Sequence, residues 1–205
     1  MITANQYAVF FICALLAGAF LPSAAAAQDD GGEGEVLAGT CLGCHGIAGY
    51  RNAYPSYRVP KLGGQKKDYL AAALRAYRDG DRPHPTMQAQ GTTLTDAEID
   101  TLAAHFQGEE AARDTVTADD IAGIDAAQTC LACHGAQASG VVPTPATLSG
   151  QHQDYLVHAL RQYKNGARPG NVMSAFASML SEADMEKIAR LYSRREGLHT
   201  PGRKD

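Results

Sequence analysis

Charge is absent from the first 27 residues of this 205-residue chain. The apolar run "AVFFICALLAGAFL" in this segment is followed by Pro22 and the small residues "SAAAA", the pattern of a signal-peptide core and its cleavage site. We therefore predict that residues 1–27 are a signal peptide and that the chain is exported to the periplasm. The segment also lacks the usual Lys or Arg at its start, so an uncleaved membrane anchor is the alternative.

An excess of basic residues is absent as well. The chain has 22 acidic and 18 basic residues, which gives no basic patch of the kind that binds nucleic acid. The charge is unevenly spread, because residues 28–115 carry a net charge of -4 and residues 116–205 carry a net charge of zero. We expect the two halves to present different faces to protein partners, with no nucleic acid among them.

Alternating apolar and polar residues, which mark a half-buried strand, do not occur over any convincing length. Apolar residues recur instead at the helical spacing i, i+1, i+4, i+5 and i+8 in two segments. These residues are Tyr69, Leu70, Ala73, Leu74 and Tyr77, and then Tyr155, Leu156, Ala159, Leu160 and Tyr163. Gly80 and Gly166 follow the two segments and end the predicted helices. The predicted fold class is all-α.

The two helices belong to an internal duplication. Residues 62–87 align with residues 148–173 at a constant offset of 86, without a gap. In each copy a loop containing Arg-Pro follows the helix and runs to a methionine. "TDAE" (95–98) and "SEAD" (181–184) then open a further helix with a capping box.

The duplication predicts two tandem domains. We place the first at residues 28–110 and the second at residues 121–205, joined by a polar linker at residues 111–120. The segments "EGEVLAGTC" and "DIAGIDAAQTC" are predicted helices that lead into a repeated cysteine motif. A domain of about 80 residues has a small core and often needs a cofactor or another staple.

Cysteine is scarce, and its placement is informative. Cys13 lies in the predicted signal peptide, and the other four cysteines all belong to "CLGCH" (41–45) and "CLACH" (130–134). The C-x-x-C-H pattern is typical of c-type haem attachment. We therefore predict two covalently bound haem c groups, the first held by Cys41 and Cys44 and the second by Cys130 and Cys133. His45 and His134 are the predicted proximal iron ligands.

Two other uses of C-x-x-C pairs fit this sequence less well than haem attachment does. A single structural zinc site built from both pairs would leave the matched histidines and methionines without a role. A thioredoxin-like dithiol needs a βαβ context, and no strand is predicted.

The sixth iron ligand separates electron transfer from catalysis, because a closed iron exchanges electrons and an open one binds small molecules. Met87 and Met173 recur at equivalent places after the same loop, whereas an arbitrary methionine would be a core residue. We predict that they are the sixth ligands. Met179 is assigned to packing and His84 to the surface, because neither has a counterpart in the other half.

The sequence resembles the dihaem cytochromes c4, within the class I cytochromes c. The motifs that carry the resemblance are "CLGCHG", "LRAYRDGDRP" and "LTDAEIDTLAAHF" in the first half, and "CLACHG", "LSGQHQDYL" and "LRQYKNGARP" in the second. The resemblance implies two low-spin haems with His/Met ligation and domains related by a pseudo-twofold axis. It also implies a periplasmic electron carrier between the cytochrome bc1 complex and terminal oxidases, soluble or peripherally attached to the membrane.

The resemblance also implies an orienting residue for each proximal histidine. In the family, the carbonyl of a proline before the K-L-x-G-Q stretch orients the ring; Pro60 fits this position, but Ala146 takes it in the second half. Arg82 and Arg168 recur beside prolines, where a hydrogen bond to a haem propionate and plain loop solvation are equally expected.

Two further functions were considered. The chain could be the cytochrome subunit of a periplasmic dehydrogenase that oxidises sulfide, thiosulfate or an alcohol. It could also be an enzyme in its own right, such as a dihaem peroxidase or a thiosulfate dehydrogenase. The enzyme class needs a reactive or unusually ligated iron, and the two matched methionines argue against it. We expect an electron carrier with no reaction of its own.

Overall fold

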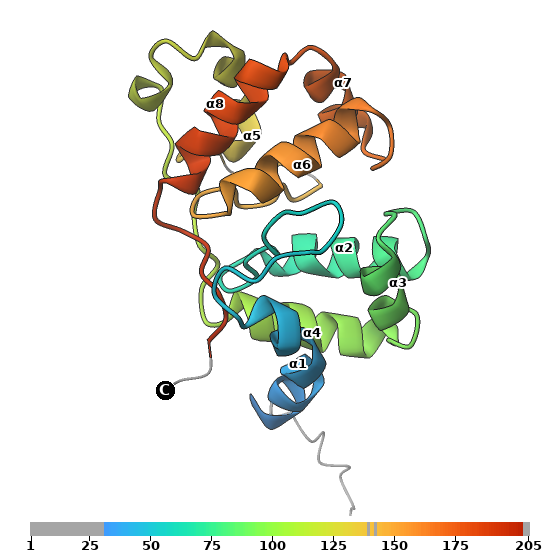
Figure 1. Cartoon of the computed structure of the whole chain (residues 1–205). Helices are drawn as coiled ribbons and strands as arrows, with labels where there is room; N and C mark the ends of the chain where they lie inside the picture. The colour runs from blue at the N-terminus through green and yellow to red at the C-terminus, as the bar shows by residue number, and fades with distance from the viewer. Residues whose placement is uncertain (1–30, 139, 142, 203–205) are drawn as a thin grey trace, which may run out of the picture.

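The computed structural model describes residues 31–138, 140–141 and 143–202, so the predicted signal peptide lies outside the described residues. The chain forms two helical domains, one above the other in Figure 1. The first domain contains α1 (Gly31–His45), α2 (Lys67–Arg78), α3 (Pro85–Gly91) and α4 (Asp96–Gln107). The second contains the 3₁₀ segments η1 (Asp119–Ile121) and η2 (Asp125–Cys130), followed by α5 (Leu131–His134), α6 (Gln153–Lys164), α7 (Asn171–Ser178) and α8 (Glu182–Ser193).

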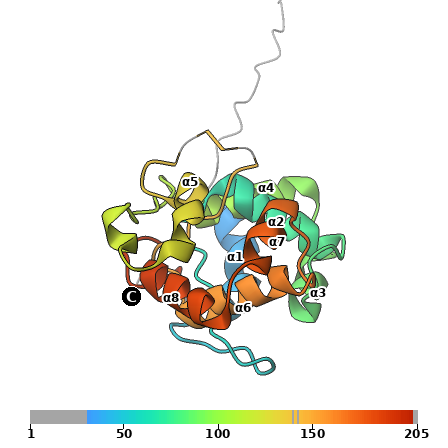
Figure 2. The same cartoon turned by 90° about the horizontal axis from the view of Figure 1, so that it is seen from above.

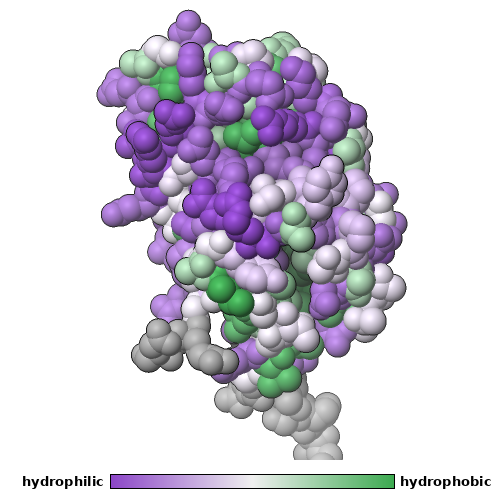
Figure 3. Space-filling view, in the orientation of Figure 1, coloured by the Kyte–Doolittle hydropathy of each residue, from purple (hydrophilic) through white to green (hydrophobic). Residues whose placement is uncertain are grey.

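The predicted all-α class is confirmed. In the described residues the only extended pairings are two isolated bridges, between Arg51 and Arg58 and between Gly63 and His199. No helix in this part of the chain is long and apolar enough to cross a membrane. On the face seen in Figure 3, hydrophilic side chains cover most of the upper domain and apolar ones form small separate patches.

The main helices end and begin where the sequence predicts. Gly80 and Gly166 follow α2 and α6 with φ angles of 83° and 75°, a backbone region that glycine adopts without strain. Both predicted capping boxes are present, at the start of α4 (Thr95 with Glu98) and of α8 (Ser181 with Asp184).

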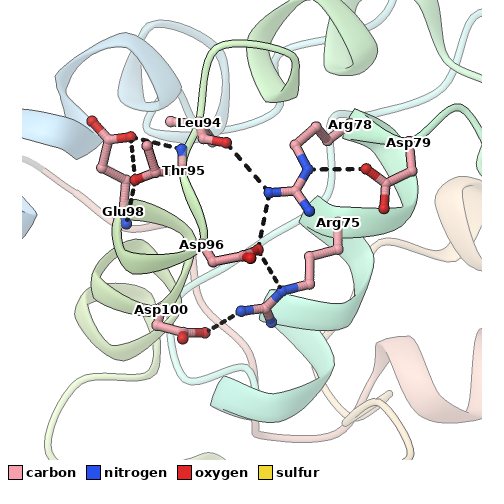
Figure 4. Close-up of polar contacts among 8 residues, drawn as sticks. All are labelled: Arg75, Arg78, Asp79, Leu94, Thr95, Asp96, Glu98 and Asp100. Carbon is pink, nitrogen blue, oxygen red and sulfur yellow. Dashed lines mark hydrogen bonds and ion pairs between the residues drawn. The ribbon is translucent and has the colours of Figure 1, made fainter.

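Ion pairs join α2 to α4 on the surface of the first domain. Figure 4 shows Arg75 between Asp96 and Asp100, at 3.1 and 2.9 Å, and Arg78 beside Asp96 at 2.9 Å. The carboxylates are exposed, so water and salt screen these pairs and each adds little to stability.

Two sequence predictions of local structure were wrong. The segment "DIAGIDAAQTC" is not one helix but two 3₁₀ segments, because Gly123 between them has a φ of 78°. Met87 and Met173 do not end a loop but lie inside the short helices α3 and α7. Pro85 begins α3, a position where its missing N–H costs nothing.

Each domain has its own hydrophobic core. The first core is built around α1, α2 and α4 from Ala38, Leu70, Ala71, Ile99, Leu102, Ala103 and Phe106. The second is built mainly around α6 and α8 from Val116, Ile121, Ala127, Leu156, Val157, Leu180, Met185, Ile188, Ala189 and Tyr192. The separation of these two clusters confirms a pair of tandem domains.

The interface between the domains repeats its contacts about a pseudo-twofold axis. The buried amide of Gln65 donates to Thr147 O at 3.0 Å and accepts from Thr147 N at 2.9 Å. Gln151, 86 residues after Gln65, pairs in the same way with the backbone of Lys61, at 3.0 Å in both directions. Because the two amides are buried, separating the domains would break all four hydrogen bonds and leave their donors and acceptors to pair with water.

The longer loop of the first domain contacts Asp154 of the second domain, and at the equivalent place Thr144 of the second domain donates to the carboxylate of Asp68 at 3.2 Å. Three extra residues lie between the first cysteine motif and the repeated block. This loop projects beside the second domain in Figure 2, and its Arg58 donates to the carboxylate of Asp154 at 3.1 Å. Arg51 lies 3.2 Å from the same carboxylate.

Two chain segments cross between the domains. The first, residues 108–118, leaves α4 and packs Asp114 and Val116 into the second domain. The second, residues 194–202, leaves α8 and pairs His199 with Gly63 of the first domain, N to O at 3.0 Å in both directions. Both run along the same side of the molecule in Figure 1. We call them the linker arm and the C-terminal arm.

A pH-dependent stability follows from His152 at this interface. Burial lowers its pKa to about 4 from the ordinary 6.5, with smaller contributions from Lys61 and Arg58. Between pH 6.5 and about 4 the unfolded chain therefore binds a proton that the folded chain does not, so the free energy of unfolding falls as the pH falls. With solvent screening of a half-exposed ring, we expect a loss on the order of 1 kcal/mol.

Denaturant unfolding at a series of pH values measures this effect. His152→Gln should show a flatter pH dependence across that window than the unaltered protein. Equal slopes for the two proteins would mean that other groups account for the loss.

Candidate functional site

The two predicted proximal histidines are buried and held in the same way. His45 Nδ1 lies 2.7 Å from Pro60 O, and His134 Nδ1 lies 2.8 Å from Ala146 O. A carbonyl can only accept, so Nδ1 carries the proton in both rings and Nε2 keeps a free lone pair. Burial lowers the pKa of each imidazole and favours this neutral form. Metal-binding histidines are commonly oriented in this way, by a hydrogen bond from the ring nitrogen that does not bind the metal.

Ala146 stands where the family has a proline, and this difference has no effect on the hydrogen bond. The orienting group is a backbone carbonyl, which alanine supplies as well as proline does. The second site gains a further bond, because Tyr192 Oη donates to His134 O at 3.0 Å. The equivalent residue in the first domain is Phe106, which has no hydroxyl.

The four predicted attachment cysteines are free thiols, partly buried next to the histidines. Cys41 and Cys44 lie one turn apart near the end of α1, and Cys130 and Cys133 span the junction of η2 and α5. Burial raises the pKa of Cys41 and of Cys130, so these thiols are not poised as a low-pKa redox dithiol.

A shared zinc site is not formed. Across residues 31–138, 140–141 and 143–202, no three His, Cys, Asp or Glu side chains gather as a metal ion would require. The two cysteine pairs belong to different domains.

The predicted sixth ligands lie on matching helices. Met87 on α3 and Met173 on α7 are both partly buried, and α3 packs on α2 as α7 packs on α6. Their ligation of iron stays a prediction. Met179, by contrast, is 70 % exposed at the end of α7, so its assignment to core packing was wrong.

His84 was expected at the surface, but it has a structural role. Its Nδ1 accepts the N–H of Met87 at 3.2 Å and caps the start of α3. Its Nε2 lies 3.1 Å from Tyr57 Oη, and since Nδ1 accepts, Nε2 carries the proton and donates. The Tyr57 ring stacks on His158 of the second domain at 4.1 Å. His84 thus links the Met87 helix to the domain interface.

Arg82 and Arg168 are buried, so of the two roles expected for them, loop solvation is wrong. Arg82 Nη2 donates to Tyr155 Oη of the other domain at 2.8 Å, and Arg168 Nη2 donates to Tyr69 Oη at 2.8 Å. Each guanidinium also lies over a tyrosine ring of its own domain: Arg82 lies 4.4 Å from the Tyr77 ring centre, and Arg168 lies similarly over that of Tyr163.

The electrostatics of this cluster are strongly positive. Burial alone would raise the pKa of Tyr69, but Arg168 and Arg82 overcome this effect and lower it to about 8. Neither arginine has a carboxylate partner within the described residues. Two buried cations without counter-ions are costly, and an anionic group bound beside them would relieve the cost.

The residues present fit two haem c groups. Each domain supplies a pair of free thiols, a neutral histidine with Nε2 available, and a buried arginine that suits a propionate. The thiols, histidines and arginines were predicted from the sequence, but the roles of Tyr57, Tyr69 and Tyr155 beside them were not. Tyr69 and Tyr155 recur at the repeat offset of 86, and this recurrence could have indicated a shared role. The sequence alone was interpreted as placing them on a helix face.

Comparisons with known proteins agree with this arrangement. A protein-family model described as "Cytochrome C oxidase, cbb3-type, subunit III" matches residues 27–106 and 117–191, once in each domain. Cytochrome c4 of Pseudomonas aeruginosa is 28 % identical over 200 residues, which cover 87 % of this chain and 94 % of that protein.

Two other similar proteins bear on function. The thiosulfate dehydrogenase electron acceptor of Thiomonas intermedia is 28 % identical over 172 residues, covering 75 % of this chain and 77 % of that one. The solved structure of Acidithiobacillus ferrooxidans cytochrome c4 superposes with a TM-score of 0.61 at 28 % identity, covering 76 % of this chain and 98 % of that one.

Proposed function

Since this chain belongs to the dihaem cytochrome c4 family, we propose that it carries electrons in the periplasm from a quinol-oxidising complex of the bc1 type to a terminal oxidase. The chain is an electron-transfer cytochrome with covalently bound haem c, and its two C-x-x-C-H motifs fit that attachment. Each haem, when bound, supplies an iron that gains and loses one electron.

The observation that carries the proposal is the pair of matched, neutral histidines. His45 and His134 each direct Nδ1–H to a backbone carbonyl, which leaves Nε2 for the iron. Met87 and Met173 supply the sixth ligand from α3 and α7. Both sites are then closed to small molecules, so the chain relays electrons and catalyses no reaction of its own.

The buried arginines have a place in this function. Arg82 and Arg168 each hold a tyrosine of the opposite domain, and each would donate to a propionate of the haem in its own domain. The same side chains would then orient the two haems and fasten the domains together, which would keep the distance for electron transfer between the haems constant.

The two ends of the molecule suit different partners. Beside α8, a hollow of about 630 Å³ is lined by four basic residues, one acidic residue and three apolar ones: Lys187, Arg190, Arg194 and Arg195, then Glu186, then Ile124, Ala183 and Leu191. No acidic partner of Lys187, Arg190 or Arg194 occurs among the described residues. This end favours an acidic partner, and the acidic first half favours a basic one.

Stopped-flow spectroscopy at the haem absorption band tests the proposal. The reduced protein should be oxidised by membranes that contain a terminal oxidase, and the oxidised protein should be reduced by a quinol-oxidising complex. At least one rate should depend on ionic strength. Failure to exchange electrons with either preparation would contradict the proposal.

A second candidate function is the electron-accepting subunit of a periplasmic dehydrogenase. It is favoured by the likeness to a protein named as the electron acceptor of thiosulfate dehydrogenase. Rapid reduction by one co-purifying dehydrogenase, together with no reduction by quinol-oxidising membranes, would establish this function instead.

A further inference from the structure

Asp114, on the linker arm, is a buried carboxylate with an unpaired oxygen. Only 6 % of the residue is exposed. Its Oδ1 accepts two backbone N–H groups, from Leu148 at 2.7 Å and from Ser149 at 2.8 Å. Its Oδ2 is the one buried side-chain nitrogen or oxygen in the described part of the chain that has no hydrogen-bond partner. Such a group costs stability, so we looked for another role for this carboxylate in what lies beside it.

Two sets of backbone contacts hold Asp114 of the linker arm close to His134, the second proximal histidine. Ala146, whose carbonyl accepts from His134, lies two residues before Leu148, to which Asp114 is bonded. On the other side, Ala136 N donates to Val116 O at 2.8 Å, so residues 114–116 run beside the chain that leaves His134. Burial lowers the pKa of His134, and the Asp114 carboxylate opposes this, as expected for a nearby negative charge. Burial also raises the pKa of Asp114, and the N–H groups of Ser149 and Leu148 oppose that rise by favouring the ionised carboxylate.

The first domain has the same architecture without the charge. There the C-terminal arm lies behind His45. The carbonyl oxygen of Pro201 is so close to Gly46, the residue after His45, that a Cβ at this position would lie 3.1 Å from it. His199 O accepts from Gly63 N at 3.0 Å, as the carboxylate of Asp114 accepts from Ser149 N. The residue 86 positions after Asp114 is Thr200, which is neutral. One proximal histidine therefore has a carboxylate behind it, and the other has a backbone carbonyl.

We propose that Asp114 lowers the midpoint potential of the second haem, because its carboxylate places a buried negative charge behind His134. The inference rests on the proposed function, because it requires His134 to ligate the iron. An oxidised iron carries one more positive charge than a reduced one, so a nearby carboxylate stabilises the oxidised state. Lys66 opposes this effect from the first domain, but it is only partly buried and it is the weakest of the groups acting on His134.

Redox titration of the holoprotein with optical detection tests the proposal. Asp114→Asn keeps an oxygen for the two N–H donors and removes the charge. We expect the equilibrium constant for reduction of one haem to increase about tenfold. Its midpoint potential should therefore rise by about 59 mV, the value for a one-electron couple. Nuclear magnetic resonance of the haem methyl groups in the oxidised protein identifies the haem that changes, and it should be the second.

Two variants make the test specific. Asp114→Glu keeps the charge and should leave both potentials close to those of the unaltered protein. Asp119→Asn removes an exposed charge from the start of η1 nearby and should shift the second potential much less. Unchanged potentials in folded Asp114→Asn, or an equal shift in Asp119→Asn, would overturn the proposal. Chemical mediators replace the partners in this titration, so its failure is separate from a failure of electron exchange with membranes.

Discussion

A variant with Cys41→Ser and Cys44→Ser should carry one haem per chain instead of two, and its first domain should lose most of its stability. The first core contains few large side chains, and Leu62, Leu74 and Leu94 around it are only partly buried. The haem would cover them, at about 25 cal/mol for each Å² of apolar surface removed from water. Losing a haem from so small a domain should therefore cost several kcal/mol.

Mass spectrometry and denaturant unfolding measure both parts of this prediction. The unaltered chain should contain two covalent haem masses, and the variant should contain one. The matched control is Cys130→Ser with Cys133→Ser, which should lose the other haem and destabilise the second domain. Two haems retained in either double variant would disprove the assignment of these cysteines.

Met87→Ala should open one iron to carbon monoxide and leave the other closed. The reduced protein should then show about half of the spectral change expected when both irons bind the gas, and one midpoint potential should fall, because an axial methionine raises the potential. Met173→Ala should give the same result in the second domain. Optical titration with carbon monoxide measures the fraction of open iron.

Met179→Ala is the control for this experiment. Met179 is the exposed methionine at the end of α7, so its removal should leave both irons closed. Carbon monoxide binding in the Met179 variant, without binding in the Met173 variant, would show that the second-half ligand had been assigned to the wrong methionine.

The local features of the fold could be predicted because they depend on neighbouring residues. The capping boxes, the glycine stops and the helical stripes all follow from residues a few positions apart. The orientation of His134 was less predictable from side chains, since the group that fixes it is the carbonyl of Ala146. Every residue has such a carbonyl, so the sequence does not mark it.

The domain interface could not be predicted, because it depends on contacts between distant residues. Arg82 and Tyr155 are 73 positions apart, and a buried arginine is rare enough that loop solvation was a reasonable expectation. His84 was misplaced for a related reason. Its lack of a counterpart argued against a repeated role, but it caps α3 in the first domain only.

The two arms close the two sites with residues from different parts of the chain. The wall behind His134 comes from residues 114–116, which precede the second cysteine motif. The wall behind His45 comes from His199 and Pro201, which follow α8 of the other domain. The first domain is therefore closed by residues that follow the second, so its site is covered on that side only when the two domains are docked.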